Sequence, residues 1–226
     1  MSESNLILLG PPGSGKGTQG ETLQDDLRLP YYATGDILRA AVREGSELGG
    51  EAKEYMSRGD LVPDELIIEV IADRVQGKEA SDGFILDGFP RTVPQAEALE
   101  EKMNDLGRSI TAALMIDVSD EDVLRRLGGR RTCEDGGHVF HLEFNPPKQE
   151  GVCDVDGSKL IVRDDDRPEV IQNRLDQYHT KTEPLIAYYE DQGILQLIDG
   201  TPPPEAVSER IRGLLATLRR EDEMEM

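Results

Sequence analysis

The feature that most constrains the fold is a short apolar run that stops at a glycine-rich turn. Residues 5–9 read NLILL, and GPPGSGKGT follows directly at residues 10–18. Such a run is typical of a buried parallel strand, and the polar-apolar pattern of residues 16–27 predicts the helix that comes next. In the order strand, loop and helix, the loop N–H groups and the helix amino terminus converge on one anion. The segment therefore predicts a phosphate-binding loop in an α/β protein.

The loop departs at one position from the pattern G-x-x-x-x-G-K-[ST], in which the last hydroxyl ligates Mg²⁺. Gly17 follows Lys16, so the loop has no hydroxyl there. We expect Lys16 to contact the outer phosphates while the backbone N–H groups surround the phosphate chain. Mg²⁺ usually keeps several waters and substrate phosphate oxygens, so the missing hydroxyl is chemically reasonable. The alternative is a glycine-rich turn that holds no nucleotide.

Further apolar runs alternate with segments of helical period. We predict strands at residues 31–33, 84–86, 112–116 and 194–198, and helices that include residues 64–75 and 169–191. Strands that alternate with helices indicate a parallel sheet covered on both faces. Asp64 and Ser119 are predicted to cap the helices that begin there, because their side-chain oxygens can accept from free backbone N–H groups.

Two segments interrupt this alternation. Residues 35–62 are predicted to form helices with no strand between them. Residues 130–166 are rich in Gly, Pro and polar residues, and short alternating stretches such as HVFHL predict a small β-rich insertion. At 226 residues, the chain is expected to form one domain, residues 1–226, that carries these two insertions.

The charge of the chain excludes some partners. Acidic residues outnumber basic residues by 46 to 25, a formal net charge of −21, so nucleic acid and anionic membranes are expected to be repelled. This excess, with only 4% aromatic residues, is typical of proteins adapted to molar salt, where a Debye length of about 3 Å relieves self-repulsion. An acidic protein without that adaptation is the alternative. No apolar run approaches the ~18 residues of a membrane span, and the amino terminus has no positive region, so we expect a cytoplasmic protein.

A second acidic element follows another predicted strand. In FILDGFPR, residues 84–91, Asp87 ends an apolar run as the carboxylate of a Walker B element does. We expect it to orient water on a metal ion. The alternative is that Asp87 only caps the segment that follows.

Four motifs in this order resemble the adenylate kinase family. They are GPPGSGKGT at residues 10–18, TGDILR at 34–39, LDGFPRT at 86–92 and GRR at 129–131. The resemblance covers most of the chain, and the glycine after the lysine is a residue that this family carries. It implies a P-loop nucleoside monophosphate kinase fold: a five-stranded parallel sheet with helices on both faces, a helical NMP-binding insertion at residues 35–62 and a β-rich lid at residues 130–166. It also implies a monomer that catalyses Mg²⁺-dependent, reversible phosphoryl transfer, ATP + AMP ⇌ 2 ADP. With the charge, it favours a halophilic archaeal source.

The same resemblance implies roles for residues at matching positions. The implied ATP site comprises Gly13, Ser14, Gly15, Lys16, Gly17, Thr18, Arg126, Arg130 and His141. The implied AMP site comprises Thr34, Arg39, Leu61, Val62, Gly88, Arg91, Gln95, Arg163 and Arg174. The implied catalytic residues are Lys16, Asp87, Arg91, Arg130, Arg163 and Arg174, and Asp165 and Asp166 are implied to stabilise closure of the lid.

Chemistry gives an independent reason for the many arginines. Two polyanions must be brought together in line, and a planar guanidinium can contact the spread charge of the transition state bidentately. The alternative is that these arginines are surface ion-pair partners, each worth ~0–1 kcal/mol.

The lid segment also contains a candidate metal site. Some lids of the family hold a structural zinc through four Cys, or three Cys and an Asp, and others use a polar hydrogen-bond network. Gly136 stands at the position of the second ligand and cannot bind a metal, but His138 lies two residues further on. The set Cys133, His138, Cys153 and Asp156 would complete a tetrahedral site with no position open for substrate. A metal-free network and a disulfide between the two cysteines are the alternatives.

Three other functions are considered. A UMP or CMP kinase generally has a much shorter lid than residues 130–166. A nucleotide-binding switch or hydrolase would leave TGDILR, residues 34–39, without a task. A zinc-stabilised nucleic-acid binder is opposed by the negative charge and the scarcity of aromatic residues.

Overall fold

The computed structural model describes the backbone of residues 3–225 and the side chains of residues 3–220. Its centre is a five-stranded parallel sheet with the order β2-β3-β1-β4-β8. The strands are β1 (Ser4–Leu9), β2 (Tyr31–Ala33), β3 (Gly83–Asp87), β4 (Ala112–Asp117) and β8 (Leu195–Asp199). All five coincide with apolar runs of the sequence, which confirms the predicted α/β fold with a five-stranded parallel sheet.

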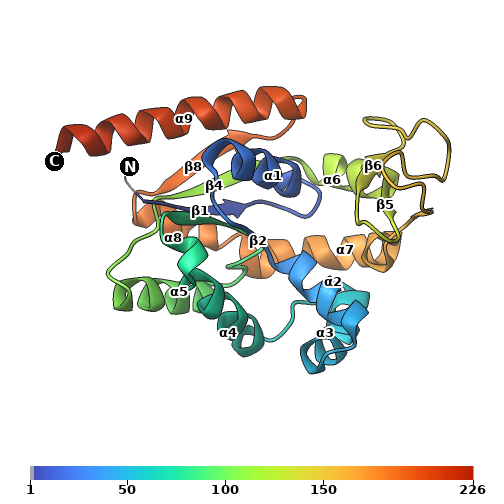
Figure 1. Ribbon diagram of the computed structural model, residues 1–226, viewed down its shortest axis with the longest axis horizontal. Helices are drawn as coiled ribbons and strands as arrows, with labels where there is room; N and C mark the ends of the chain where they lie inside the picture. Colours follow the sequence, from blue (N-terminus) through green and yellow to red (C-terminus); the bar gives the residue numbers. More distant parts are fainter. Residues whose placement is uncertain (1–2, 226) are drawn as a thin grey trace.

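Helices cover both faces of this sheet because successive strand residues point to opposite sides. Leu8 packs with Leu23 and Ile211 on one face, whereas Ile7 packs with Ile71 on the other. The first face is covered by α1 (Lys16–Leu27) and α9 (Pro204–Glu225), and the second by α4 (Asp64–Val75), α5 (Val93–Asp105) and α8 (Leu185–Asp191) (Figure 1).

The single helix predicted over residues 169–191 is wrong in its continuity. Helix α7 (Pro168–Gln177) passes into a π-helical turn at Tyr178–Thr182, and α8 begins only after Pro184. The Glu183 N–H donates to the Tyr178 carbonyl at 2.8 Å, which is the five-residue spacing of a π-turn. Proline has no N–H and its ring clashes with the preceding turn, so an unbroken α-helix through Pro184 is disfavoured.

Two structures project from the carboxyl-terminal edge of the sheet, at the end of the molecule away from both termini (Figure 1). One is the helix pair α2 (Thr34–Glu44) and α3 (Glu47–Arg58), as residues 35–62 predict. The other is a three-stranded antiparallel sheet, ordered β6-β5-β7, which we call the small sheet. Its strands are β5 (Arg130–Cys133), β6 (Val139–His141) and β7 (Leu160–Ile161), which lie between α6 (Asp120–Gly129) and α7.

One of the two predicted helix caps is confirmed. The Ser119 hydroxyl accepts from the Asp122 N–H at 3.2 Å and so caps α6. Asp64, by contrast, is the first residue of α4 and Pro63 precedes it as the cap residue. The Asp64 carboxylate instead accepts from Thr92 Oγ1 at 2.8 Å and from Gln95 Nε2 at 2.7 Å, which ties α4 to the start of α5.

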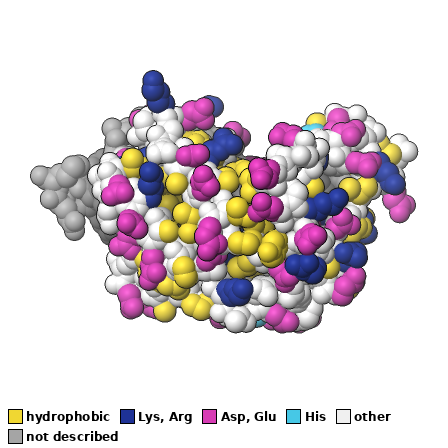
Figure 2. Space-filling view, turned by 90° about the horizontal axis from the view of Figure 1, so that it is seen from below, with side chains coloured by type: hydrophobic (Ala, Val, Ile, Leu, Met, Phe, Trp, Pro, Cys, Tyr) yellow, Lys and Arg dark blue, Asp and Glu magenta, His cyan; other side chains and the backbone are white. Residues whose placement is uncertain are grey.

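The surface of the described residues carries its acidic side chains over many elements. Figure 2 shows them scattered across one face and not gathered in a single patch. Among the described helices, none combines the length and the apolar character needed to cross a lipid bilayer.

Candidate active site

The glycine-rich loop joins β1 to α1. Gly13 and Gly15 have φ of +77° and +103°, a region open to glycine but unfavourable for other residues, which lets successive N–H groups turn inward. The Lys16 ammonium donates to the carbonyls of Gly10 and Pro11, both at 2.8 Å, so it lies inside the loop. Burial lowers the pKa of Lys16 from 10.5 to about 8, and Asp87 opposes this while Arg91 adds to it. The loop therefore holds an ammonium that a phosphate group would stabilise.

Asp87 ends β3 at the carboxyl-terminal edge of the sheet, beside this loop. Its Oδ2 accepts from the Tyr31 hydroxyl at 2.7 Å. Its main-chain carbonyl accepts from Thr34 Oγ1 at 3.1 Å, and the Gly88 carbonyl accepts from the same hydroxyl at 2.8 Å. Carboxylate oxygens suit Mg²⁺, so the Asp87 carboxylate fits a group that orients a hydrated magnesium ion.

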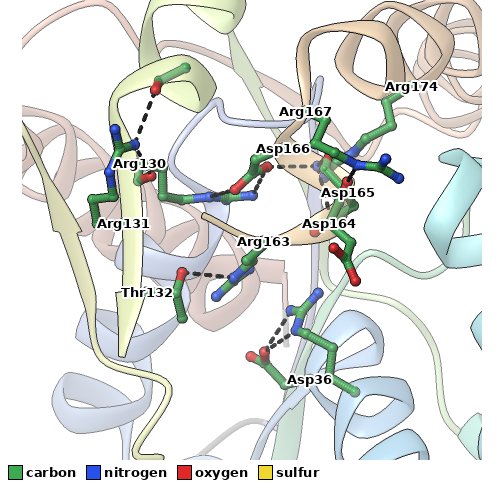
Figure 3. Close-up of polar contacts among 12 residues, drawn as sticks. Asp36, Arg130, Arg131, Thr132, Arg163, Asp164, Asp165, Asp166, Arg167 and Arg174 are labelled. Atoms are coloured by element: carbon green, nitrogen blue, oxygen red, sulfur yellow. Dashed lines mark hydrogen bonds and ion pairs between the residues drawn. The ribbon is translucent and has the colours of Figure 1, made fainter. Parts of the chain in front are cut away.

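Arginines from two elements meet around two aspartates that follow the small sheet (Figure 3). Arg130, from β5, donates to Asp166 with both Nε and Nη2, at 2.7 and 2.5 Å. Arg174, from α7, donates to the same carboxylate at 3.1 Å and lies 3.0 Å from Asp165 Oδ2. The Asp166 side chain is fully buried. The two aspartates thus hold two guanidinium groups close together.

Three further arginines, Arg39, Arg91 and Arg163, lie near Arg130 and Arg174. Arg163 donates to Thr132 Oγ1 at 2.9 Å, Arg91 to the Gly88 carbonyl at 2.9 Å, and Arg39 to the Asp36 carboxylate at 2.6 Å. The repulsion between these guanidinium groups affects their pKa values. Burial, with nearby guanidinium groups, lowers the pKa of Arg91 and of Arg163 to about 10, and it also lowers the pKa of Arg174.

Asp165 responds to the same field with the opposite sign. Burial alone would raise the pKa of its carboxyl, but Arg174, Arg130 and their neighbours outweigh burial and lower it. The site is therefore a region of concentrated positive charge that favours anions.

Three of the residues implied for AMP, Thr34, Gly88 and Gln95, lie beside Arg91. A Cβ at Gly88 would be 2.7 Å from Thr34 Oγ1 and 2.9 Å from Arg91 Nη2, so the three residues are in close contact. Gln95 is buried; its Oε1 accepts from the Arg91 N–H at 2.7 Å and its Nε2 donates to Asp64. Since an amide has two donor hydrogens and two acceptor lone pairs, each end of Gln95 keeps capacity for one further bond. Leu61 and the buried Val62 lie between α3 and α4.

Arg126, on α6, contacts the glycine-rich loop, and His141 lies on β6 of the small sheet. Arg126 donates to the Ser14 carbonyl at 3.1 Å and to the Gly200 carbonyl at 2.8 Å, which ties α6 to the glycine-rich loop and to the end of β8. The His141 ring stacks on Phe144 with 4.4 Å between centroids. The Arg126 guanidinium thus supports the glycine-rich loop. The His141 ring, stacked on Phe144, lies on the small sheet that follows α6.

Four side chains of the small sheet segment form a cluster with the geometry of a metal site. The ligand atoms of Cys133, His138, Cys153 and Asp156 all lie within 4.8 Å of one another. Cys133 Sγ is 3.1 Å from Asp156 Oδ2, and His138 Nδ1 is 3.4 Å from both Cys153 Sγ and Asp156 Oδ2. Two ligands bound tetrahedrally to zinc at their usual bond lengths are about 3.3–3.8 Å apart. The two 3.4 Å contacts of His138 match this spacing, and two thiols, an imidazole and a carboxylate are donors that suit zinc. The two cysteines are not joined by a disulfide.

Gly136 explains why a histidine two residues away belongs to this cluster. A Cβ at Gly136 would lie 2.4 Å from His138 Cε1 and 2.6 Å from Asp156 Oδ2. The imidazole therefore occupies the space that a side chain at position 136 would need. Hydrogen bonds from Ser158 and Cys133 hold the pKa of Asp156 well below its usual range, which keeps the carboxylate ionised as a ligand must be.

The partners of the site residues that were missed from the sequence include Tyr31, Asp36 and Thr132. Asp36 and Arg39 have the i, i+3 spacing of a helical ion pair, which was a usable signal. Thr132 contacts Arg163 across 31 positions, and Tyr31 contacts Asp87 across 56. No local pattern marks either contact.

Comparison with known proteins agrees with this geometry. A family model described as adenylate kinase matches residues 8–194. An adenylate kinase of Agathobacter rectalis is 48% identical over 210 residues, which are 93% of this chain and 98% of that protein. An adenylate kinase of Methanosarcina mazei is 49% identical over 212 residues, 94% of this chain and 98% of that protein. A glycine-rich loop with a half-buried lysine, a carboxylate at a strand end and converging guanidinium groups all stand in a chain of matching length, and so the chain belongs to the adenylate kinase family.

Proposed function

We propose that the glycine-rich loop and the arginine cluster carry out the adenylate kinase reaction, in which ATP and AMP are converted reversibly to two ADP. The family and its relatives support the reaction itself. The observation that carries the assignment of residues is the convergence of Lys16 with Arg91, Arg130 and Arg174, whose charges each lower the pKa of the ammonium. A set of cations whose charges oppose one another in this way favours the binding of further anions beside it.

ATP would bind with its phosphates in the loop formed by Gly13, Ser14, Gly15, Gly17 and Thr18. Lys16 would exchange its contacts with the Gly10 and Pro11 carbonyls for phosphate oxygens, which are stronger, charge-assisted partners. Magnesium bound with ATP supplies charge neutralisation on the phosphates, and Asp87 would hold water on that ion. Arg126 and His141 would contact the adenine.

AMP would bind on the opposite side of Asp87. Arg39 and Arg91 would hold its phosphate, which requires Arg39 to release the exposed Asp36 carboxylate. Thr34, Gln95, Gly88 and the backbone of Leu61 and Val62 would contact the adenine. The spare hydrogen-bonding capacity at each end of Gln95 supports this role.

The transferred phosphoryl group would lie between the two nucleotides, against Arg130, Arg163 and Arg174. Their planar guanidinium groups can contact the equatorial oxygens bidentately as charge develops. Asp165 and Asp166 already set the angle of Arg130 and Arg174, so the donors are preorganised and not free to rotate.

Enclosure of the nucleotides would come from the two structures at the end of the sheet. We assign residues 35–62 as the NMP-binding part and residues 130–166 as the lid, which together exclude water that would otherwise accept the phosphoryl group. The working unit is proposed to be a monomer.

A structural zinc ion would stabilise the lid. Four buried residues of the lid, Cys133, Phe140, Cys153 and Leu160, form a small cluster. Two of them, Cys133 and Cys153, are also proposed zinc ligands. With all four zinc positions filled by protein, the ion would join the two turns of the segment and take no part in the reaction.

The test measures ADP formation with AMP, UMP, CMP and GMP as acceptors, in wild type and in Arg130→Ala and Arg174→Ala. AMP is expected to be preferred, and each variant is expected to lose kcat by about 10²–10³-fold with a smaller change in KM. Arg212→Ala is the matched control, because Arg212, on α9, forms an exposed ion pair with Asp26 of α1, and it should match wild type. Equal rates for Arg130→Ala and Arg212→Ala would remove Arg130 from the mechanism. ADP formation without added AMP would indicate a hydrolase.

A further inference from the structure

We propose that Tyr31 is a positioning residue for Asp87, and that its hydroxyl, by orienting the carboxylate that holds water on the ion, compensates for the metal-binding hydroxyl that the glycine-rich loop lacks at Gly17. The inference rests on the proposed function, in which Asp87 holds water on the magnesium ion. It adds a residue from β2 to the group that fixes this carboxylate.

The sheet brings the two side chains together. Strands β2 and β3 are parallel and pair Tyr31 with Ile85, and Asp87 lies two residues further along β3. Because side chains alternate along a strand, Ile85 and Asp87 point to the same face, which is the face covered by α1. The Tyr31 hydroxyl reaches across to donate to Asp87 Oδ2 at 2.7 Å.

Two glycines of α1 make room for the tyrosine. Gly17 and Gly20 are three residues apart, so they lie on one side of the helix. A Cβ at Gly20 would be 2.3 Å from Tyr31 Cε2, which means that no larger residue fits while the ring stays in place. A Cβ at Gly17 would be 3.8 Å from the Tyr31 hydroxyl oxygen. The tyrosine hydroxyl thus stands beside the position at which a loop serine or threonine would carry its own.

The Tyr31 hydroxyl remains a donor under working conditions. Burial, and then the neighbouring Asp87 charge, raises the pKa of Tyr31 above its ordinary value, so the phenol keeps its proton. Its hydrogen bond to a carboxylate is charge-assisted and directional. This bond occupies Oδ2, and the described contacts leave Asp87 Oδ1 for water on the ion. A residue that only filled space would need the ring and not the hydroxyl.

Tyr31→Phe separates these two roles, because it keeps the ring against Gly20 and removes only the donor. The first readout is binding and not turnover: the affinity for Mn²⁺, used in place of Mg²⁺, in the complex with a dinucleotide inhibitor that joins two adenosines through five phosphates. Free Mn²⁺ is counted by electron paramagnetic resonance. Loss of a partner that orients a direct metal ligand typically costs about 10–100-fold in affinity. Asp87 holds water on the ion and Tyr31 holds Asp87, so the dissociation constant is expected to rise toward the lower end of that range, roughly 10-fold.

The second readout is kinetic. In Tyr31→Phe, kcat is expected to fall and the Mg²⁺ concentration for half-maximal rate to rise by a similar factor, while KM for AMP stays the same. Tyr32→Phe is the matched control: it removes one hydroxyl from the next residue, whose ring packs into the opposite face of the sheet. It is expected to match wild type in both readouts.

Rescue tests the link to the loop. Gly17→Ser in the Tyr31→Phe background returns a hydroxyl to the loop, where a Cβ meets nothing closer than 3.8 Å. The double variant is expected to recover most of the lost Mn²⁺ affinity. Failure to recover any of it would overturn the claim that the Tyr31 hydroxyl compensates for the missing loop hydroxyl.

Asp87→Asn distinguishes failure of this inference from failure of the proposed function. If Asp87→Asn weakens Mn²⁺ binding and Tyr31→Phe does not, Asp87 keeps its role and the inference about Tyr31 is wrong. If Asp87→Asn leaves both Mn²⁺ affinity and kcat unchanged, the proposed role of Asp87 is wrong and the inference fails with it. A loss in Tyr31→Phe that is the same at every Mg²⁺ concentration also overturns the inference.

Discussion

The pKa of Lys16 predicts how activity and stability depend on pH. Burial lowers this pKa from 10.5 to about 8 in the protein without nucleotide. The kcat/KM for ATP reports the free enzyme, so it should fall about tenfold for each pH unit above about 8 as the ammonium loses its proton. Phosphates favour the charged form, so the corresponding fall in kcat should lie at higher pH. Initial rates of ADP formation from pH 6 to pH 10, at saturating AMP, measure both.

Stability gives an independent check of the same group. Between pH 8 and 10.5 the unfolded chain binds a proton at Lys16 that the folded protein does not, so the free energy of unfolding should rise with pH in this window. The difference between 10.5 and about 8, at about 1.36 kcal/mol for each pH unit, gives a limit of about 3.4 kcal/mol. Below pH 8 both states are protonated, so the full cost of burying the charge is present. At pH above 10.5 the cost is absent.

Two variants isolate the contribution of Lys16. Lys16→Arg does not titrate in this range, so its kcat/KM should lack the limb near pH 8, whatever its absolute value. Lys16→Met removes the charge, so its advantage in stability over wild type, measured by urea unfolding, should shrink as the pH rises from 8 to 10.5. A flat kcat/KM from pH 7 to pH 9.5 in wild type would refute the reasoning, as would the same limb in Lys16→Arg.

Three further outcomes follow from other parts of the structure. Purified protein should contain about one zinc ion per chain. His138→Ala should lose this ion, and amide hydrogen exchange should become faster in residues 130–163 but not in the central sheet. Metal analysis and hydrogen exchange on the same samples measure both. Asp166→Asn should lower the free energy of unfolding by about 3–5 kcal/mol in a urea titration, because it leaves Arg130 and Arg174 with a neutral buried partner, and an effect below ~1 kcal/mol would contradict the burial argument. The melting temperature should rise between 0.1 M and 1 M KCl, because the Debye length falls from about 10 Å to about 3 Å and screens the repulsion of a chain with net charge −21.

Much of the fold could be predicted because its signals are local. Each strand of the central sheet is a short apolar run, and the loop from Gly10 to Thr18 lies directly between a strand and a helix. The break in the helix at Tyr178–Thr182 had a local signal as well, since Pro184 stands within the predicted range. The prediction of one helix followed the apolar period of residues 169–191 and gave Pro184 too little importance.

The partners of the site residues could not be predicted in the same way. Asp166 neutralises Arg130 across 36 positions, and Tyr31 meets Asp87 only because β2 and β3 are neighbours in the sheet. Neither pairing leaves a trace in periodicity, because each depends on how strands and helices pack. The resemblance to a family supplied the arginines but not the contacts that orient them.

His138 shows why residue type, spacing and space must be considered together. Sequence alone places Gly136 at the second ligand position and offers His138 as a substitute without a reason. The structure supplies the reason, since any side chain at position 136 would collide with the imidazole and with Asp156. The same relation links Gly20 to Tyr31, where the absent side chain on α1 and the large ring on β2 fill one volume. In both places a glycine is needed because another side chain occupies the space: His138, two positions from Gly136, and Tyr31, on a different element from Gly20. Each of these side chains brings a polar atom to the site. A glycine that departs from a motif is therefore a reason to search for the side chain that replaces the lost group.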